Sequence, residues 1–132
     1  MIKIGILGDI GSGKSYISKQ FGYPVFNADA EVAKIYRKDK NCFYKLKKKF
    51  PHYINSFPIK KKYISNAIID NKNNLKKIIK IVHPIVRIQM KKFFKKNKKK
   101  RIVILDVPLL IENKLNRNNY ILIFVDSKKK EI

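Results

Sequence analysis

The sequence predicts an α/β fold in which helices cover both faces of a doubly wound parallel sheet. Three apolar runs have the length of strands and little alternation with polar residues, at positions 2–7, 102–105 and 120–125. Such runs are typical of parallel strands, because these strands are buried on both faces. The segments between them carry apolar residues at helical spacing, and this alternation of strand and helix indicates a parallel sheet.

The N-terminal part of the chain predicts two strands of this sheet and the helices that follow them. The expected elements are, in order, a strand at 2–7, a loop at 8–15, a helix to about Phe21, a turn at 22–24, a strand at 25–26 and a helix from Ala30 to about 40. Gly22, Tyr23 and Pro24 supply the chemistry of the turn.

The stretch from about 41 to 100 predicts a helical, substrate-binding insertion within a single domain that spans 1–132. Its apolar spacing indicates a short helix that Pro51 ends and a helical segment that opens at Pro58. A longer helical pattern follows, and Pro84 is expected to kink or restart it, because proline lacks the N–H donor and its ring clashes with the preceding turn.

The most specific motif follows the first strand. Positions 8–15 read Gly-Asp-Ile-Gly-Ser-Gly-Lys-Ser, which is the G-x-x-x-x-G-K-S pattern of the Walker A phosphate-binding loop. Gly11 and Gly13 lack Cβ atoms, so backbone N–H groups can close around phosphate oxygens. Lys14 supplies a positive charge for the β- and γ-phosphates, and the Ser15 hydroxyl is suited to bind Mg²⁺. The motif predicts that the chain binds a nucleoside triphosphate.

Three carboxylates follow predicted strands, at the edge where doubly wound sheets bind ligands. We expect Asp29 to act as the base toward an acceptor hydroxyl, because a strand beside the loop-bearing strand can face the γ-phosphate without holding the metal. The alternative is an N-cap for the helix from Ala30. Asp106 stands where a Walker B acid would hold Mg²⁺, or is a turn residue at a strand end. Asp126 is interpreted only as a strand-end or cap residue.

Histidine and cysteine give weaker indications. His83, next to Pro84, is a candidate for contact with a substrate, although a lone histidine at a helix break is more often structural. No group of cysteines and histidines has zinc-site spacing, and Cys42 has no second cysteine for an internal disulfide. With neither a signal-peptide pattern at the start nor about 20 uninterrupted apolar residues, we expect a cytoplasmic location.

The net charge of +23 raises the question of a nucleic-acid partner. Arginine would be favoured for contacts with bases and phosphates, but only four of the 32 basic residues are arginines. Isoleucine, asparagine, tyrosine and phenylalanine are abundant as well, and this joint bias is what an AT-rich coding sequence produces. We interpret the lysines as a solvated surface that can steer polyphosphate ligands, and we expect no specific nucleic-acid partner.

Four blocks of the chain together resemble the dephospho-coenzyme A kinases, a family of P-loop kinases. The order and spacing of the four are more specific than the loop, which many NTPases share. The resemblance implies the P-loop NTPase fold and transfer of the γ-phosphoryl group of Mg·ATP to the ribose 3′-hydroxyl of dephospho-CoA. The blocks are the loop at 8–15, Pro24-Val25-Phe26-Asn27-Ala28-Asp29 with Val32-Ala33, His83-Pro84-Ile85-Val86-Arg87, and Asp106-Val107-Pro108-Leu109-Leu110-Ile111-Glu112-Asn113.

The resemblance also implies roles for individual residues. The family's base, the second acid of an Asp-Ala-Asp motif, falls on Asp29, and Lys14 is the other expected catalytic residue. His83 and Arg87 are expected to help shape the pocket for the pantetheine-nucleotide substrate. Ser15 and Asp106 are the expected ligands of Mg²⁺, which enters with ATP. The expected ATP-binding residues are Gly11, Ser12, Gly13, Lys14, Ser15 and Tyr16.

The chain departs from the family pattern at several points. The first acid of the Asp-Ala-Asp motif is Asn27, and Tyr16 stands where threonine is common. Asp9 replaces a glycine, and we expect its carboxylate to turn outward because it would otherwise repel phosphate. The chain stops at Ile132, whereas the family continues with an arginine-bearing lid, a fifth strand and an adenine-contacting loop. The sequence is therefore either a fragment or naturally short.

Three other functions remain open from the sequence. The chain could belong to another small-molecule or nucleoside kinase on the same core, or to a basic NTPase associated with nucleic acid. It could also bind phosphate without catalysis, because the lid arginines that neutralise transition-state charge are absent. The expected partners are ATP and dephospho-CoA, with no membrane, and the oligomeric state does not follow from the sequence.

Overall fold

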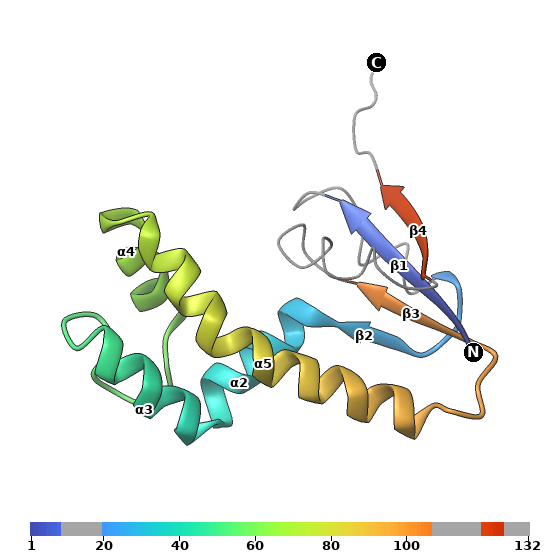
Figure 1. Cartoon of the computed structure of the whole chain (residues 1–132), viewed down its shortest axis with the longest axis horizontal. Helices are drawn as coiled ribbons and strands as arrows, with labels where there is room; N and C mark the ends of the chain where they lie inside the picture. Colours follow the sequence, from blue (N-terminus) through green and yellow to red (C-terminus); the bar gives the residue numbers. More distant parts are fainter. Residues whose placement is uncertain (9–19, 107–119, 126–132) are drawn as a thin grey trace, which may run out of the picture. The chain divides into compact units, whose positions relative to one another are not determined.

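A computed structural model describes residues 1–8, 20–106 and 120–125 of the chain. It divides into two compact units (Figure 1). The first, the sheet unit, comprises Met1–Asp29 and Met90–Ile132, and the second, the helical unit, is the continuous stretch Ala30–Gln89. Within the described residues, no helix combines the length and the apolar character that crossing a membrane requires.

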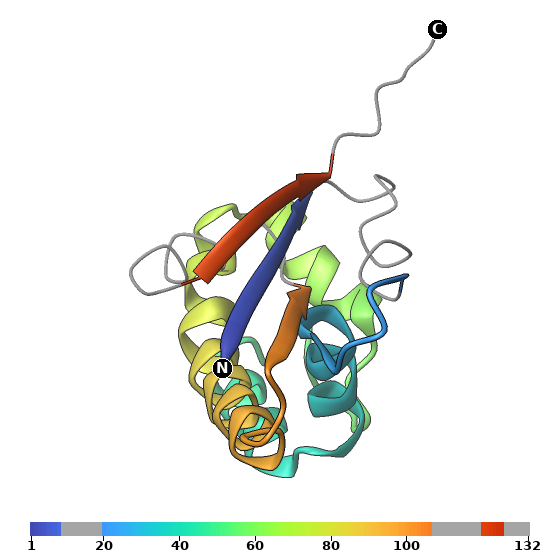
Figure 2. The same ribbon diagram turned by 90° about the vertical axis from the view of Figure 1, so that its right-hand side faces the viewer.

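The sheet unit is built on a four-stranded parallel sheet. Its strands lie in the order β2-β3-β1-β4, and Figure 2 shows β1 between β3 and β4. The predicted parallel sheet is confirmed, with each strand at the expected place in the sequence. The strands are β1 (Ile2–Gly8), β2 (Val25–Asn27), β3 (Ile102–Asp106) and β4 (Tyr120–Val125).

The order of the strands corrects one expectation. The strand that precedes Asp29 was expected beside the loop-bearing strand β1, but β3 lies between β1 and β2. β3 can pair on both sides because Val103, Ile104 and Leu105 are fully buried. β2 is only three residues long, and among the described strands it pairs with β3. Its central Phe26 is buried, while Val25 and Asn27 on either side are half-buried, which suits the edge of a sheet.

This topology defines where a ligand of the sheet unit is expected. From β1 the chain continues to β2, two strands away on one side, and from β3 it continues to β4 on the other side of β1. The direction of winding therefore reverses between β1 and β3. In doubly wound sheets the ligand crevice lies outside the carboxyl ends of the strands at this switch point. The ends of β1 and β3 are thus the reference points for the functional site.

Apolar side chains from three strands form the core of the sheet unit. Ile6 of β1 and Ile104 of β3 are fully buried, and Ile4 and Val25 pack against them. Phe26 lies next to Phe93, with ring centroids 5.5 Å apart. Full burial of one such side chain stabilises a fold by about 1.5–3 kcal/mol, so these contacts hold the strand ends in place.

In the part of the chain that the structure describes, four helices follow β2. They are α2 (Ala28–Lys38), α3 (Lys40–Lys49), α4 (Lys61–Asp70) and α5 (Asn73–Lys96). The helical unit contains α3 and α4 entire, together with most of α2 and α5. Where they belong to helices, its buried apolar side chains repeat at helical spacing, as expected from the sequence, while Phe50, Ile54 and Ile59 lie between α3 and α4. They are Ile35, Cys42, Phe43, Leu46, Phe50, Ile54, Ile59, Ile64, Ala67, Ile78, Val82 and Val86.

The start of α3 is fixed by a side-chain cap. The carboxylate of Asp39 accepts a hydrogen bond of 2.8 Å from the backbone N–H of Cys42, one of the donors that a helix N-terminus leaves without a partner. Cys42 itself is fully buried. Burial, and then the nearby Asp39 charge, raise the pKa of its thiol to about 11. The thiol is therefore a protonated core group at neutral pH.

Helix α5 corrects the expected restart at Pro84. A single helix runs from Asn73 to Lys96 with Pro84 inside it. Pro84 is exposed, so its ring faces solvent, while Val82, His83 and Val86 are buried around it. Proline removes one backbone hydrogen bond from the helix, but burial of the neighbouring side chains outweighs that loss and the helix continues.

Candidate functional site at the carboxyl edge of the sheet

The carboxyl ends of three strands bring the candidate residues of the sheet unit together. β1 ends at Gly8, β3 at Asp106 and β2 at Asn27. The strand register pairs Asp106 with Ile6 of β1 on one side and with Asn27 of β2 on the other. Asp106 therefore ends the strand directly beside β1, which continues into the phosphate-binding motif of the sequence.

The side chain of Asp106 is almost completely buried, with 2% of its surface exposed. A buried carboxylate needs hydrogen-bond donors, because its charge has lost contact with water. The amide Nδ2 of Asn27 donates to Oδ2 of Asp106 at a distance of 3.1 Å. This neighbour in the adjacent strand is one of the groups that hold the carboxylate in its place.

The oxygen atoms at this position suit a magnesium ion. Mg²⁺ prefers carboxylate oxygens and, in phosphoryl-transfer sites, is held by one or two protein groups together with substrate phosphates. The described residues contain no group of three or more His, Cys, Asp or Glu that could hold a metal on their own. A single buried carboxylate beside the end of β1 fits a metal that enters with a nucleotide.

Asp29 is the second residue of α2 and is exposed to solvent. The predicted helix start at Ala30 is wrong by two residues, because α2 begins at Ala28. Asp29 is consequently not the N-cap of this helix but a residue of its first turn. A carboxylate in the first turn is stabilised by the partial positive charge of the helix N-terminus. Its exposure leaves it accessible to a substrate.

Several residues of the sequence prediction lie outside the described part of the chain. Their expected roles stay predictions, including the outward direction of Asp9. These residues are Asp9, Gly11, Ser12, Gly13, Lys14, Ser15, Tyr16, the positions 107–113 of the fourth family block, and Asp126.

His83 and Arg87 both belong to α5, one helical turn apart. Residues four apart lie on the same face of a helix, so the two side chains start from one side of α5. Their environments differ, because His83 is 7% exposed whereas Arg87 is exposed. Arg87 is therefore accessible to an anionic ligand, and His83 is held within the helical unit.

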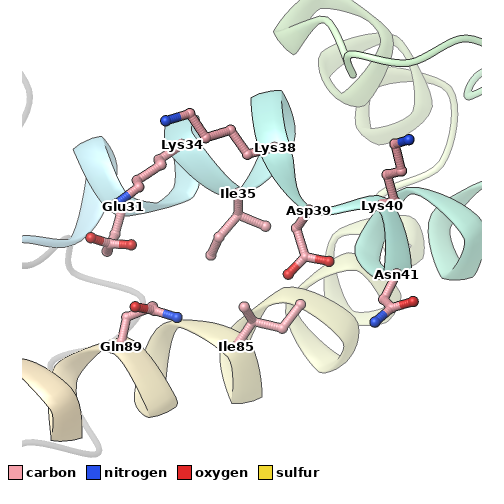
Figure 3. Close-up of a pocket in the computed structure, with 9 residues that line it drawn as sticks. All are labelled: Glu31, Lys34, Ile35, Lys38, Asp39, Lys40, Asn41, Ile85 and Gln89. Atoms are coloured by element: carbon pink, nitrogen blue, oxygen red, sulfur yellow. The ribbon is translucent and has the colours of Figure 1, made fainter.

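The helical unit contains a pocket that the sequence did not predict. It has a volume of about 480 Å³, and Figure 3 shows Ile35 and Asp39 on one side pointing toward Ile85 and Gln89 of α5 on the other. Ile85 and Gln89 lie on a different face of α5 from His83 and Arg87, which do not line it. The polar residues that line this pocket belong to no sequence motif. Ile35 and Ile85 are its two apolar lining residues, and only they could have indicated the pocket from the sequence. The lining residues are Glu31, Lys34, Ile35, Lys38, Asp39, Lys40, Asn41, Ile85 and Gln89.

Comparison with solved structures supports the fold. The chain matches the crystal structure of TT1252 from Thermus thermophilus with a TM-score of 0.76 and 30% sequence identity. The match covers 95% of this chain and 65% of that chain. It includes the parallel sheet and helices described above, and it agrees with the P-loop kinase fold that the sequence predicts.

Comparison with curated sequences gives relatives that carry one name. A dephospho-CoA kinase of Wolbachia sp. subsp. Brugia malayi is 36% identical over 127 residues, which are 92% of this chain and 65% of the relative. A dephospho-CoA kinase of Bartonella henselae is 33% identical over 116 residues, which are 84% of this chain and 59% of the relative. The chain thus spans less than two thirds of the length of these relatives.

A family model adds a comparison that covers nearly the whole chain. The model described as dephospho-CoA kinase matches residues 2–131. This span includes all four sequence blocks on which the resemblance depends, as well as the strand ends that bring Asn27 and Asp106 together. The chain belongs to the dephospho-CoA kinase family.

Proposed function

We propose that the protein transfers the γ-phosphoryl group of Mg·ATP to the 3′-hydroxyl of dephospho-CoA, which gives coenzyme A, and that it does so in the cytoplasm. The observation that carries the proposal is the meeting of β1 and β3 at the carboxyl edge of the sheet. It sets the buried Asp106 beside the strand that continues into G-x-x-x-x-G-K-S. Membership of the dephospho-CoA kinase family supports the choice of substrate.

The phosphates of ATP are assigned to the loop after β1. The backbone N–H groups of residues 11–16 would bind the phosphate oxygens, and Lys14 would neutralise charge on the β- and γ-phosphates. Ser15 and Asp106 are the residues that would hold Mg²⁺. When bound, the metal supplies a positive charge that stabilises the negative charge spread over the transferring group.

The acceptor hydroxyl is assigned to Asp29. Its carboxylate, exposed in the first turn of α2, would accept the proton of the 3′-hydroxyl as that oxygen attacks the γ-phosphorus. The new bond joins the 3′-oxygen to phosphorus, the bond between this phosphorus and the β,γ-bridging oxygen breaks, and ADP leaves. A carboxylate that takes the proton in this way acts as the general base of the transfer.

The remainder of dephospho-CoA is assigned to the helical region. The guanidinium of Arg87 is exposed and can form paired hydrogen bonds with phosphate oxygens. His83, largely buried on the same face of α5, is proposed to shape the wall of the substrate site.

The proposal is tested by offering the protein different acceptors with γ-labelled ATP. Label is expected in the 3′-phosphate of coenzyme A, with no comparable transfer to nucleosides or nucleoside monophosphates. A relative that carries the name dephospho-CoA kinase serves as the positive control. Preferential phosphorylation of a nucleoside would indicate a different small-molecule kinase. NTP hydrolysis that nucleic acid stimulates, with a steep salt dependence, would indicate a nucleic-acid-associated NTPase instead.

A further inference from the structure

We propose that Asn27 is a positioning residue that orients the Asp106 carboxylate for the metal carried by the nucleotide. This inference rests on the proposed function, because it takes Asp106 as a metal ligand. It assigns a role to the position at which the chain departs from the acid expected by resemblance.

The strand register brings the two side chains together. Asn27 is the last residue of β2 and lies opposite Asp106, the last residue of β3. Its Nδ2 donates to Oδ2 of Asp106 at 3.1 Å, between residues 79 positions apart in the sequence. Parallel strand pairing fixes both backbones at this point. The contact is therefore built into the sheet and does not depend on a long, flexible side chain.

The chemistry of the contact requires a hydrogen-bond donor. An ionised carboxylate only accepts hydrogen bonds, so the group that approaches Asp106 must be a donor. Asparagine supplies a neutral donor of the right length, and binding one carboxylate oxygen restricts rotation of the whole group. Asp106 has 2% of its surface exposed, so water can contribute little to its orientation. An ionised aspartate at position 27 would instead set two like charges against each other.

The expected consequence concerns the metal more than the nucleotide. Residues that hydrogen-bond a metal-binding carboxylate fix its direction, and their loss typically costs about 10- to 100-fold in metal affinity or activity. Asn27 is not proposed to bind the phosphates themselves, which are assigned to the loop after β1. Removal of the amide should therefore weaken the coupling between Mg²⁺ and ATP, while ATP binding without metal is unchanged.

The experiment measures that coupling by binding, without turnover. Fluorescent methylanthraniloyl-ATP is titrated into the protein in Mg²⁺ and, separately, in EDTA, and the ratio of the two Kd values gives the benefit of the metal. The variants are Asn27→Ala and Asn27→Leu. Asn97→Ala is the matched control, because Nδ2 of Asn97 lies in the same unit and donates at 2.8 Å to a backbone oxygen, that of Phe93, and not to a carboxylate. Thermal melts verify that all variants fold.

We expect the metal benefit to fall about tenfold or more in both Asn27 variants and to stay within about twofold of wild type in Asn97→Ala. The Kd in EDTA should be the same for all four proteins. A wild-type metal benefit in folded Asn27→Ala would overturn the positioning role and leave the proposed function intact. Absence of any metal benefit in the wild-type protein would overturn the metal site, and with it this inference.

Discussion

The sheet unit and the helical unit place their candidate residues in different ways. In the sheet unit, Asn27 and Asp106 meet because each is the last residue of a strand and the two strands are in register. In the helical unit, His83 and Arg87 share a face of α5 yet differ in exposure, and the pocket opens on another face. Strand pairing thus determines contacts directly, whereas a helix only determines which side chains share a face.

This difference explains why one unit is easier to interpret than the other. A shift of one residue in strand register would turn every side chain to the opposite face of the sheet, so the position of Asp106 is tightly specified. A helical residue is placed by packing against several neighbours, and its exposure follows from all of them.

Asp29→Asn is expected to lower kcat for dephospho-CoA phosphorylation by about 100- to 10,000-fold, the usual contribution of a positioned general base. The melting temperature should fall only slightly, because the side chain is exposed and the change removes only its interaction with the helix dipole, worth about 0.3–1 kcal/mol. Steady-state kinetics with a thermal melt measure both quantities. Glu31→Gln removes another carboxylate of α2 and should keep wild-type kcat. An Asp29→Asn protein with full turnover would reduce Asp29 to a first-turn residue that interacts with the helix dipole.

Leu46→Ala and Leu105→Ala form a matched pair, because both side chains are fully buried, one in each unit. Each truncation should lower the free energy of unfolding by about 2–5 kcal/mol through lost contacts and a residual cavity. Hydrogen exchange then shows where protection is lost. We expect Leu46→Ala to weaken protection mainly in α3 and α4, and Leu105→Ala mainly in the sheet. Equal loss throughout the chain in both variants would show that the two units unfold together.

Asp39→Ala should lower the free energy of unfolding by about 0.5–2 kcal/mol, the usual cost of removing an N-cap side chain. The physical reason is the lost hydrogen bond to the N–H of Cys42. Asp39→Asn keeps an acceptor oxygen at the same place and should retain most of the stability. Urea denaturation measures all three proteins. If Asp39→Asn is as unstable as Asp39→Ala, the charge matters more than the hydrogen bond.

The helical unit should also lose stability at high pH. Burial, and then Asp39, raise the pKa of Cys42 from 9.0 to about 11, and burial, and then Cys42, raise the pKa of Tyr36 from 10.0 to about 12. Above about pH 9 the unfolded chain therefore binds fewer protons than the folded chain, and the free energy of unfolding falls as pH rises.

Between pH 8 and 10 we expect Cys42 to account for a loss of about 1 kcal/mol. Urea denaturation across this range measures the slope, which should be shallower in Cys42→Ala than in the wild-type chain. An unchanged slope in the variant would show that ionisation of the Cys42 thiol does not contribute to the loss of stability at high pH.

Much of the fold follows from the sequence because long apolar runs have few alternative structures. The runs at 2–7, 102–105 and 120–125 became β1, β3 and β4, and Asp106 ends β3 as expected. The order of the strands did not follow, since apolar character indicates that a strand is buried but not which strands flank it. The expected position of the strand before Asp29, directly beside β1, is therefore wrong, because β3 occupies that position.

The helical elements show a second limit of sequence reasoning. The expected restart of a helix at Pro84 is wrong, because burial of Val82, His83 and Val86 keeps α5 continuous. The contact between Asn27 and Asp106 could not be predicted from the sequence either, because it depends on the register between two strands that are far apart in the chain. The pocket beside Ile35 and Ile85 needs the packing of α2 against α5. Each of these features results from tertiary contacts that no local pattern encodes.

The insertion of β3 between β1 and β2 has a consequence for synthesis on the ribosome. β1 and β2 emerge early but do not pair with each other, and each instead pairs with β3. Ala30–Gln89, by contrast, is one continuous stretch that emerges from the ribosome before Ile102–Asp106 does. Chains fold from the N-terminus as they are made, and non-local strand pairing is intrinsically slow. The helical unit can therefore fold first, and the carboxyl edge of the sheet forms only once β3 joins its two partners.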